Sequence, residues 1–328
     1  MTTFKGLQSP TQITAVIATR NRGDSAVVTV ESILANTHPD FRLLVIDQSD
    51  NSETREALAP FQQDPRFQIV QSSAVGLGRA HNLALTLANS PLVAITDDDC
   101  LVPTDWLSKI EAVFQQHEQV AVVYCNVLPG PHDSSQGFIP DYQQDEDRMV
   151  KTIWGKIKAR GIGAGMAVRR EPIVSLGGFD ENMGPGAEFP SAGDRDLAIR
   201  ALLKGWWVYE TVSTSVIHFG YRTWAEGREL TRRDWLAMGA MCAKPIKCGY
   251  WQTAIFALYE SIGYGILQPL APLFKGKRPQ GFRRFIFFWR GFLQGWQTPV
   301  ARDTLVFLGP EPVALPLAAR ELEQRPQA

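Results

Sequence analysis

The sequence has few cysteines, no strong excess of either charge and no long uninterrupted apolar run. Its four cysteines lack the spacing of a metal site, so we expect buried apolar side chains rather than a disulfide framework. The formal net charge of −1 argues against general nucleic-acid binding. No stretch supplies the roughly 18 apolar residues that cross a bilayer. Residues 1–10 show no secretory signal, so we expect a cytoplasmic protein.

The first half of the chain carries an α/β pattern. Short apolar runs predict strands at Ile13–Ala18, Leu43–Ile46, Phe67–Val70, Leu92–Thr96 and Val120–Tyr124. Helical patterns separate these runs, the first of them with Val27, Val30, Ile33 and Leu34 on one face. This alternation predicts a Rossmann-like α/β fold, in which helices flank a mostly parallel central sheet.

The pattern changes after the fifth expected strand. Residues 129–148 are polar and rich in proline and glycine, which predicts a surface loop or lid. A strand that starts from glycines is expected over Gly161–Val168. A helix over Leu197–Lys204, stopped by Gly205, and a short strand over Val216–His218 complete the predicted elements.

The composition shifts toward aromatic and basic residues after Tyr221. We therefore expect an α/β domain over residues 1–222 and a helical region over residues 223–328. Between Arg228 and Arg290 eleven lysines and arginines stand against three acids. The apolar stretch Ile255–Leu273 is interrupted by one glutamate and two prolines. Amphipathic helices in a membrane interface fit this composition, and an ordinary helical subdomain or dimer face is the alternative.

Three consecutive acids follow the fourth expected strand. Asp97, Asp98 and Asp99 come directly after Leu92–Thr96. In open α/β sheets, ligands bind at the carboxyl ends of the strands. Adjacent carboxylates repel one another, and a divalent cation that itself holds phosphates would relieve that repulsion. An acidic helix start is the alternative, because a helical pattern follows.

Polar motifs lie at or before the other strand ends. They are Thr19-Arg20-Asn21-Arg22, Asp47-Gln48-Ser49-Asp50-Asn51 and Gly76-Leu77-Gly78-Arg79-Ala80-His81-Asn82. Together with the acid triplet, they occur in the order seen in the inverting family 2 glycosyltransferases of the GT-A fold, which this chain resembles over about residues 12–222. The resemblance implies a GT-A fold with a C-terminal helical appendage, and transfer of a sugar from a nucleotide-sugar donor to a hydroxyl.

The resemblance also implies roles for the donor-side residues. The expected donor-binding residues are Thr19, Arg22, Asp47, Arg79, Asp97 and Asp98. Carboxylates can accept hydrogen bonds from the base or ribose, and an arginine can contact the diphosphate. Arg22 has an alternative partner in Asp24. Many family members have a second acid where this chain has Gln48, so the base stays open.

A divalent metal, Mn²⁺ or Mg²⁺, is the expected cofactor. Asp99 is the expected ligand, and the ion would bridge the diphosphate oxygens. Asp98 could ligate instead, or cap the following turn. The resemblance implies that His218 can complete the metal shell, and a purely structural histidine is the alternative.

The general base is expected on the acceptor side of the site. Ser191-Ala192-Gly193-Asp194-Arg195-Asp196-Leu197 resembles the family's Gly-Glu-Asp-x-Asp-Leu element, with Gly193 in place of the usual glutamate. The resemblance places the base at Asp194, and an N-cap or first-turn acid is the alternative. Asp196 could pair with Arg200, four residues on.

Other family-like segments surround the expected pocket. Gly177–Glu181 and Gly184–Gly186 would shape it, and Glu188 could contact a sugar or face solvent. Trp206 and Trp207 are expected to begin a strand and to pack or to stack on a sugar. The acceptor is expected to be a lipid-linked glycan, a glycolipid or a polysaccharide in cell-surface synthesis, with the enzyme peripheral at the inner face of the plasma membrane.

The alternatives to a glycosyltransferase are a non-catalytic sugar-nucleotide-binding protein and a sugar-phosphate nucleotidyltransferase. The glycine-rich loop of that last class is missing after the first strand.

Overall fold

The computed structural model describes residues 12–276 and 278–309, so the expectation about residues 1–10 lies outside the described range. The strands are β1 Ile13–Thr19, β2 Phe41–Asp47, β3 Phe67–Gln71, β4 Leu92–Asp97, β5 Cys100–Leu101, β6 Val120–Pro129, β7 Gly137–Phe138, β8 Arg148–Val150, β9 Met166–Arg169, β10 Trp207–His218 and β11 Arg222–Thr223. The α-helices are α1 Gly23–Leu34, α2 Glu53–Ala57, α3 Leu77–Leu87, α4 Trp106–Gln116, α5 Arg170–Ser175, α6 Gly193–Leu203, α7 Trp224–Lys247, α8 Gln252–Ile262, α9 Gln268–Leu270 and α10 Arg283–Gln297. A π-helical turn, Gly263–Leu267, joins α8 to α9.

The central sheet has the order β3-β2-β1-β4-β9-β6-β10-β5, with β8 paired to β10. Strands β1 to β4 run parallel, as do β6 and β10, whereas β9 lies antiparallel between β4 and β6. The five strands predicted in the first half are confirmed. The expected α/β fold with a mostly parallel sheet is also confirmed.

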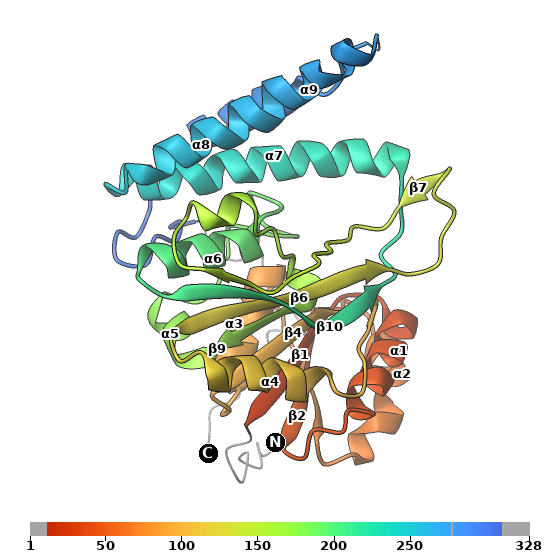
Figure 1. The fold of residues 1–328 in the computed structure, drawn as a ribbon. Coiled ribbons are helices and arrows are strands. Elements are labelled where there is room, and N and C mark those ends of the chain that lie inside the picture. The colour runs from red at the N-terminus through yellow and green to blue at the C-terminus, as the bar shows by residue number, and fades with distance from the viewer. Residues whose placement is uncertain (1–11, 277, 310–328) are drawn as a thin grey trace.

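Two apolar cores lie on opposite faces of the sheet (Figure 1). One face packs against α1 and α4, where the predicted residues Val30 and Ile33 are fully buried. The other face packs against α3, α5 and α6, and this core continues into α7 and α10. Burial on both faces explains why the strands read as continuous apolar runs.

The strand predicted over residues 161–168 is wrong in its first half. Its glycines form an irregular segment with a 3₁₀ turn at Gly163–Gly165, and β9 begins at Met166. The glycines serve close approach to β6. A Cβ atom on Gly161 would lie 2.2 Å from Tyr124, and one on Gly165 would lie 2.9 Å from Cys125. The chain therefore passes too close to β6 for side chains.

The last strand is longer than the sequence indicated. The prediction placed a strand start at Trp206 and Trp207 and a separate short strand over Val216–His218. The two form one strand, β10, which begins at Trp207 and runs over twelve residues, with an irregularity between Thr211 and Ser215. Polar residues in the middle of β10 hide its apolar pattern. Residues 129–148 are mostly loop, as expected, although β7 pairs with β11 and Tyr142 bridges to Val127.

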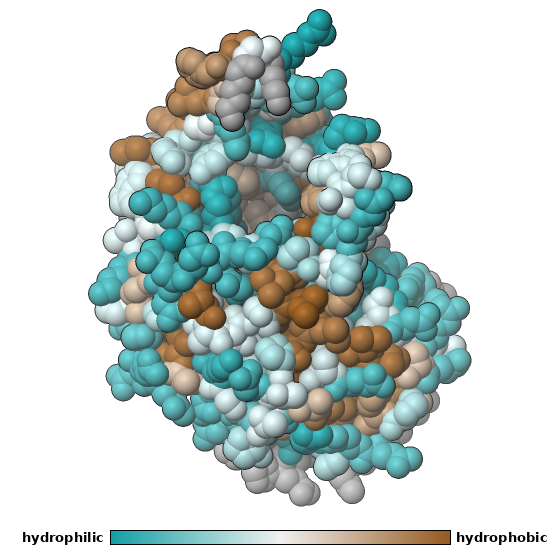
Figure 2. Space-filling model, turned by 45° about the vertical axis from the view of Figure 1, so that its right-hand side comes forward, coloured by the Kyte–Doolittle hydropathy of each residue, from teal (hydrophilic) through white to brown (hydrophobic). Residues whose placement is uncertain are grey.

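The C-terminal helices form a layer above α6 and the sheet (Figure 1). Helices α7 and α10 pack backbone to backbone, because a Cβ atom on Gly239 or Gly291 would fall within 2 Å of the opposite helix's carbonyl oxygen. Among the helices of the described residues, none combines the length and hydrophobicity needed to span a bilayer. Figure 2 shows hydrophobic residues gathered at the top of the molecule, where these helices lie, with a hollow below them.

Candidate functional site

The strand ends named by the sequence meet at one edge of the sheet. Thr19 ends β1 beside Asp47, which ends β2, and Ala18 pairs with Asp97, which ends β4. Asp98 and Asp99 form the tight turn between β4 and β5. Parallel strands present their carboxyl ends at the same edge, so this convergence follows from the sheet topology.

Arg22 and Thr19 hold the second and third acids in place. Arg22 Nη1 donates to Asp98 Oδ1 at 2.6 Å, and Nη2 donates to Asp99 Oδ2 at 2.7 Å. The Thr19 hydroxyl donates to Asp98 Oδ2 at 2.8 Å. Arg22 thus pairs with these two acids rather than with Asp24. Both oxygens of Asp98 therefore accept hydrogen bonds. Of the two Asp99 oxygens, Oδ2 accepts one, and Oδ1 has no hydrogen-bond partner among the described residues.

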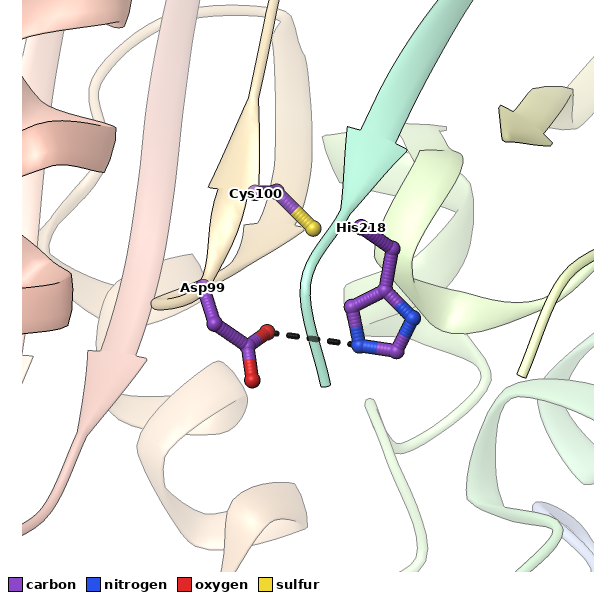
Figure 3. Close-up of side chains that lie close together, drawn as sticks. All are labelled: Asp99, Cys100 and His218. Atoms are coloured by element: carbon purple, nitrogen blue, oxygen red, sulfur yellow. Dashed lines mark ion pairs between the residues drawn. The ribbon is translucent and has the colours of Figure 1, made fainter. Parts of the chain in front are cut away.

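That free oxygen faces a histidine. Asp99 Oδ1 lies 3.3 Å from His218 Nε2, and the thiol of Cys100 is close by (Figure 3). His218 Nδ1 donates to the Pro140 carbonyl at 2.8 Å, which fixes the ring's orientation. A Cβ atom on Gly220 would lie 2.4 Å from His218 Nε2, so the chain closes this space with a residue that has no side chain.

These residues fit a divalent cation. Asp99 Oδ1 is buried and, among the described residues, has no hydrogen-bond partner. A carboxylate oxygen facing an imidazole nitrogen, whose other nitrogen is held by a carbonyl, is a common arrangement at metal sites. Burial raises the pKa of the Cys100 thiol. A protonated thiol is a poor ligand, so the carboxylate and the imidazole are the residues suited to hold the ion.

The acids of the triplet differ in their protonation. Burial and the charge of Asp99 raise the pKa of Asp97 to about 6. Burial also raises the pKa of Asp99, but the close contact with His218 and the hydrogen-bonded charge of Arg22 outweigh it and bring that pKa to about 2. Burial lowers the pKa of His218, but its contacts with Asp99 and the Pro140 carbonyl outweigh this and raise it overall.

The remaining donor-side residues lie along the same edge. Asp47 is buried and accepts a hydrogen bond from the Ser49 amide at 2.9 Å. Gln48 bonds through both its amide atoms to the loop before α3, with Gly76 as a partner of each. Arg79 donates to Glu181 at 3.4 Å and to the Val75 carbonyl at 2.9 Å. Gln48 therefore holds the loop that leads into α3, the helix that carries Arg79.

Asp194 lies in the first turn of α6, across the site from the triplet. The Thr96 hydroxyl, next to Asp97, donates a 2.7 Å hydrogen bond to the Ala164 carbonyl, and a Cβ atom on the adjacent Gly163 would lie 3.5 Å from Asp194 Oδ2. The glycine segment thus links Asp194 to the end of β4. Ala192 caps α6 in a left-handed conformation, and Asp194 Oδ1 accepts a 2.7 Å hydrogen bond from the Arg195 amide. Asp194 is thus a first-turn acid, and the Tyr124 hydroxyl donates to its carbonyl at 2.9 Å.

Several residues near Asp194 had no sequence signal of a role in the site. Asp234 of α7 accepts a 2.5 Å hydrogen bond from Ser191, and burial raises its pKa. Lys156 is fully buried over the Tyr124 ring, and its ammonium has no hydrogen-bond partner in the described part of the chain. Burial lowers the pKa of Lys156 to about 8. Asp234 and Lys156 lie far from Asp194 in the sequence, so no local motif links them to it.

The pairing predicted within α6 is confirmed, since Asp196 and Arg200 form a buried ion pair of 2.8 Å. Glu188 is exposed in its loop. Trp206 packs against the apolar core, and the Lys151 ammonium lies 4.1 Å from the Trp207 ring centroid. Cys100, Cys125 and Cys242 are buried, as expected, while Cys248 is half-buried.

Residues 14–175 match the sequence family described as glycosyl transferase family 2. This segment, just under half of the chain, belongs to that family. Family 2 relatives include the O-antigen biosynthesis protein RfbC of Myxococcus xanthus, 27% identical over 227 residues, or 63% of this chain and 17% of that protein. The beta-monoglucosyldiacylglycerol synthase of Trichormus variabilis is 23% identical over 247 residues, or 68% of this chain and 50% of that one. The chain thus spans half or less of the length of these relatives.

Solved structures of glycosyltransferases share the fold. The mannosyltransferase PcManGT from Pyrobaculum calidifontis, in complex with GDP-Man and Mn²⁺, superposes with a TM-score of 0.59 at 18% identity, covering 88% of each chain. Residues 1–349 of S. aureus TarS superpose with a TM-score of 0.57 at 13% identity, covering 89% of this chain and 95% of that one. The GT-A fold expected of this family 2 member is thereby confirmed.

Proposed function

We propose that this protein is an inverting glycosyltransferase that moves a sugar from a nucleotide-sugar donor to a hydroxyl acceptor, in the synthesis of a cell-surface polysaccharide or glycolipid. The observation that carries this proposal is the meeting of two acidic groups in one site. Asp99 and its neighbours lie at the strand ends, and Asp194 of α6 reaches the end of β4 across the segment that contains Gly163 and Ala164. Inverting transfer needs both a donor side and a general base on the acceptor side.

On the donor side, Asp47 and Asp97 would accept hydrogen bonds from the nucleoside, and Arg79 would contact the diphosphate. Thr19 and Arg22 would act by holding Asp98 and Asp99, as their hydrogen bonds indicate. Asp99 and His218 would hold Mn²⁺ or Mg²⁺, and such an ion offsets negative charge on a leaving diphosphate.

On the acceptor side, Asp194 would take the proton of the attacking hydroxyl. The acceptor oxygen bonds to the anomeric carbon while the bond from that carbon to the diphosphate oxygen breaks. A single displacement of this kind inverts the configuration at the anomeric carbon. The nucleoside diphosphate leaves with the electron pair of the broken bond, and the proton stays on the Asp194 carboxylate until solvent removes it.

A panel of nucleotide sugars, with and without Mn²⁺, tests this proposal. Ligands that bind the folded state raise the apparent melting temperature, so a true donor should raise it more with the metal present. The same donor should then release its nucleoside diphosphate slowly to water. No shift and no release across the panel would contradict the proposal. Binding without turnover would indicate a non-catalytic protein, and release of pyrophosphate from a nucleoside triphosphate would indicate a nucleotidyltransferase.

We further propose that residues 1–222 bind the donor and that residues 223–328 place the enzyme on the inner face of a membrane, near a lipid-linked acceptor. Leu267 and Phe274 are 60% and 93% exposed and line an open apolar groove of about 550 Å³. Arg278 is exposed between this groove and α10, and Arg283 is exposed at the start of α10. Apolar side chains beside basic ones suit an anionic bilayer surface.

Vesicle co-sedimentation tests the membrane proposal. The full chain should sediment with vesicles that contain phosphatidylglycerol and much less with neutral phosphatidylcholine vesicles. Phe274→Glu should weaken sedimentation. Val28→Glu is the matched control, since Val28 is 49% exposed on α1, on the other side of the molecule. Equal sedimentation of the two variants would contradict the proposed surface.

A further inference from the structure

Helix α8 has two chemically different faces. Its inner face carries Phe256 and Glu260, both fully buried, and Tyr264 continues this stripe four residues later in the π-helical turn. Its outer face carries Ile255 and Leu258, which are 59% and 45% exposed. A fully buried glutamate on a helix of this kind needs a partner, because burial of an unpaired charge is strongly unfavourable.

Glu260 has two such partners. Arg160 Nη2 donates to its Oε1 at 3.0 Å, and Arg195 Nη2 donates to the same oxygen at 3.1 Å. The neighbours of Glu260 on the stripe cover the two guanidinium groups. The Arg160 guanidinium lies 4.2 Å from the centre of the Tyr264 ring, and that of Arg195 lies 6.0 Å from the centre of the Phe256 ring. The inner face of α8 and the following turn therefore bind two arginines from distant parts of the chain.

Both arginines adjoin the surroundings of Asp194. Arg195 follows Asp194 in the chain, and its amide donates the 2.7 Å hydrogen bond to Asp194 Oδ1. Arg160 leads into the glycine segment, where a Cβ atom on Gly163 would lie 3.5 Å from Asp194 Oδ2. One carboxylate from the C-terminal helices thus anchors a segment on each side of the Asp194 carboxylate.

Stability alone does not account for this arrangement. A buried ion pair is often no more stabilising than well-packed apolar residues of similar volume. The same place could be filled by leucine or methionine, but apolar side chains would not orient two guanidinium groups. Precise orientation matters at a reacting centre, since a displacement of about 1 Å can cost roughly 100-fold in rate.

We propose that Glu260 is a positioning residue, which sets the geometry of Asp194 through Arg195 and Arg160. This inference rests on the proposed role of Asp194 as general base. Because Glu260 is fully buried, it would act through the two arginines and not by contact with the donor or the acceptor. The α8 helix is therefore part of the transfer apparatus, in addition to carrying an outer apolar face.

Turnover of the donor from the nucleotide-sugar panel, with water as acceptor and Mn²⁺ present, tests the proposal. Glu260→Gln should lower kcat about 10- to 100-fold, while the donor KM and the donor-induced rise in melting temperature stay within twofold of wild type. Glu260→Asp should recover part of the loss. Glu229→Gln is the matched control, because Glu229 also pairs with two arginines, Arg232 and Arg233, but on an exposed surface. It should leave kcat unchanged.

The outcomes separate the two proposals. An inactive Asp194→Asn variant beside a fully active Glu260→Gln variant would overturn the positioning role and leave the proposed function intact. Wild-type activity in Asp194→Asn would overturn the base assignment itself. If Glu260→Gln does not fold, Arg160→Gln decides, since Arg160 is one-third exposed and Glu260 keeps its ion pair with Arg195 in that variant. A lowered kcat at unchanged KM supports the proposal, and unchanged kcat overturns it.

Discussion

Arg22 and Asp99 form an ion pair of 2.7 Å on the carboxylate oxygen Oδ2, whereas Oδ1 of the same group faces His218. One guanidinium nitrogen thus occupies one oxygen of Asp99 and leaves the other without a hydrogen-bond partner among the described residues. Because Arg22 also pairs with Asp98, a single positive charge compensates two crowded acids. Asp98 has both carboxylate oxygens hydrogen-bonded, whereas Asp99 keeps one oxygen that faces His218.

Replacement of Asp99 tests the metal site. Asp99→Asn should abolish Mn²⁺-dependent turnover of the donor, with a loss above the 10- to 100-fold typical of partners that only orient metal ligands. Calorimetric titration with Mn²⁺ should show lost binding. Cys100→Ala is the control, and it should retain the metal because the thiol is buried and protonated. Tight Mn²⁺ binding by Asp99→Asn would show that the ion binds elsewhere.

Replacement of Asp194 tests the base. Asp194→Asn should lower kcat by about 10²- to 10⁴-fold, the usual contribution of a positioned base, because an amide cannot accept the proton. Donor binding, measured by the rise in melting temperature, should persist. Asp105→Asn, an exposed acid at the start of α4, serves as control. Loss of donor binding together with turnover would instead place Asp194 on the donor side.

A buried lysine joins the C-terminal helices to the sheet domain. Lys244 of α7 is fully buried and pairs with Asp180 at 2.5 Å and with Asp196 at 2.7 Å. Lys244→Met should lower the free energy of unfolding by about 3–5 kcal/mol, because it leaves the buried Asp180 carboxylate without its cation, whereas Asp196 keeps Arg200. Urea denaturation measures this change. Lys109→Met, which breaks an exposed pair on α4, should cost less than about 1 kcal/mol. Equal losses would contradict the role of Lys244.

Acid should weaken the fold through His81. Burial against Phe179 lowers the pKa of His81 to about 4, so this histidine stays neutral in the folded protein. The unfolded chain takes up a proton near pH 6.5, and between that pH and about 4 it binds more protons than the folded chain. Stability is therefore complete above pH 6.5 and falls as the pH drops toward 4, by up to roughly 3 kcal/mol.

The comparison of wild type with His81→Gln isolates this effect. Both proteins also carry acids that titrate in the same range, and their contribution cancels in the difference. The free energy of unfolding of the variant should fall less between pH 7 and pH 4.5. Parallel curves for the two proteins would show that the pKa of His81 is the same in the folded and the unfolded chain, which would contradict the prediction.

The strands and their polar ends could be predicted from the sequence because both are local patterns. Asp47, Asp97 and Thr19 each end an apolar run, and parallel strands bring such ends to one edge. The glycine segment before β9 was harder, since its conformation depends on contact with Tyr124 and Cys125 of β6. Strand β10 was underestimated because polar residues interrupt its alternation.

By itself, the sequence determined the α/β rhythm, the acids at the strand ends and the segment that carries Asp194, because periodicity and strand-end chemistry are encoded by neighbouring residues. The tertiary structure alone decided which residues support them. Glu260 is a lone acid in an apolar stretch, and its partners lie 65 and 100 residues away. Lys244 and Asp180 are 64 residues apart. Buried charges find partners only when the chain has packed, since the free energy that couples them depends on distance in space.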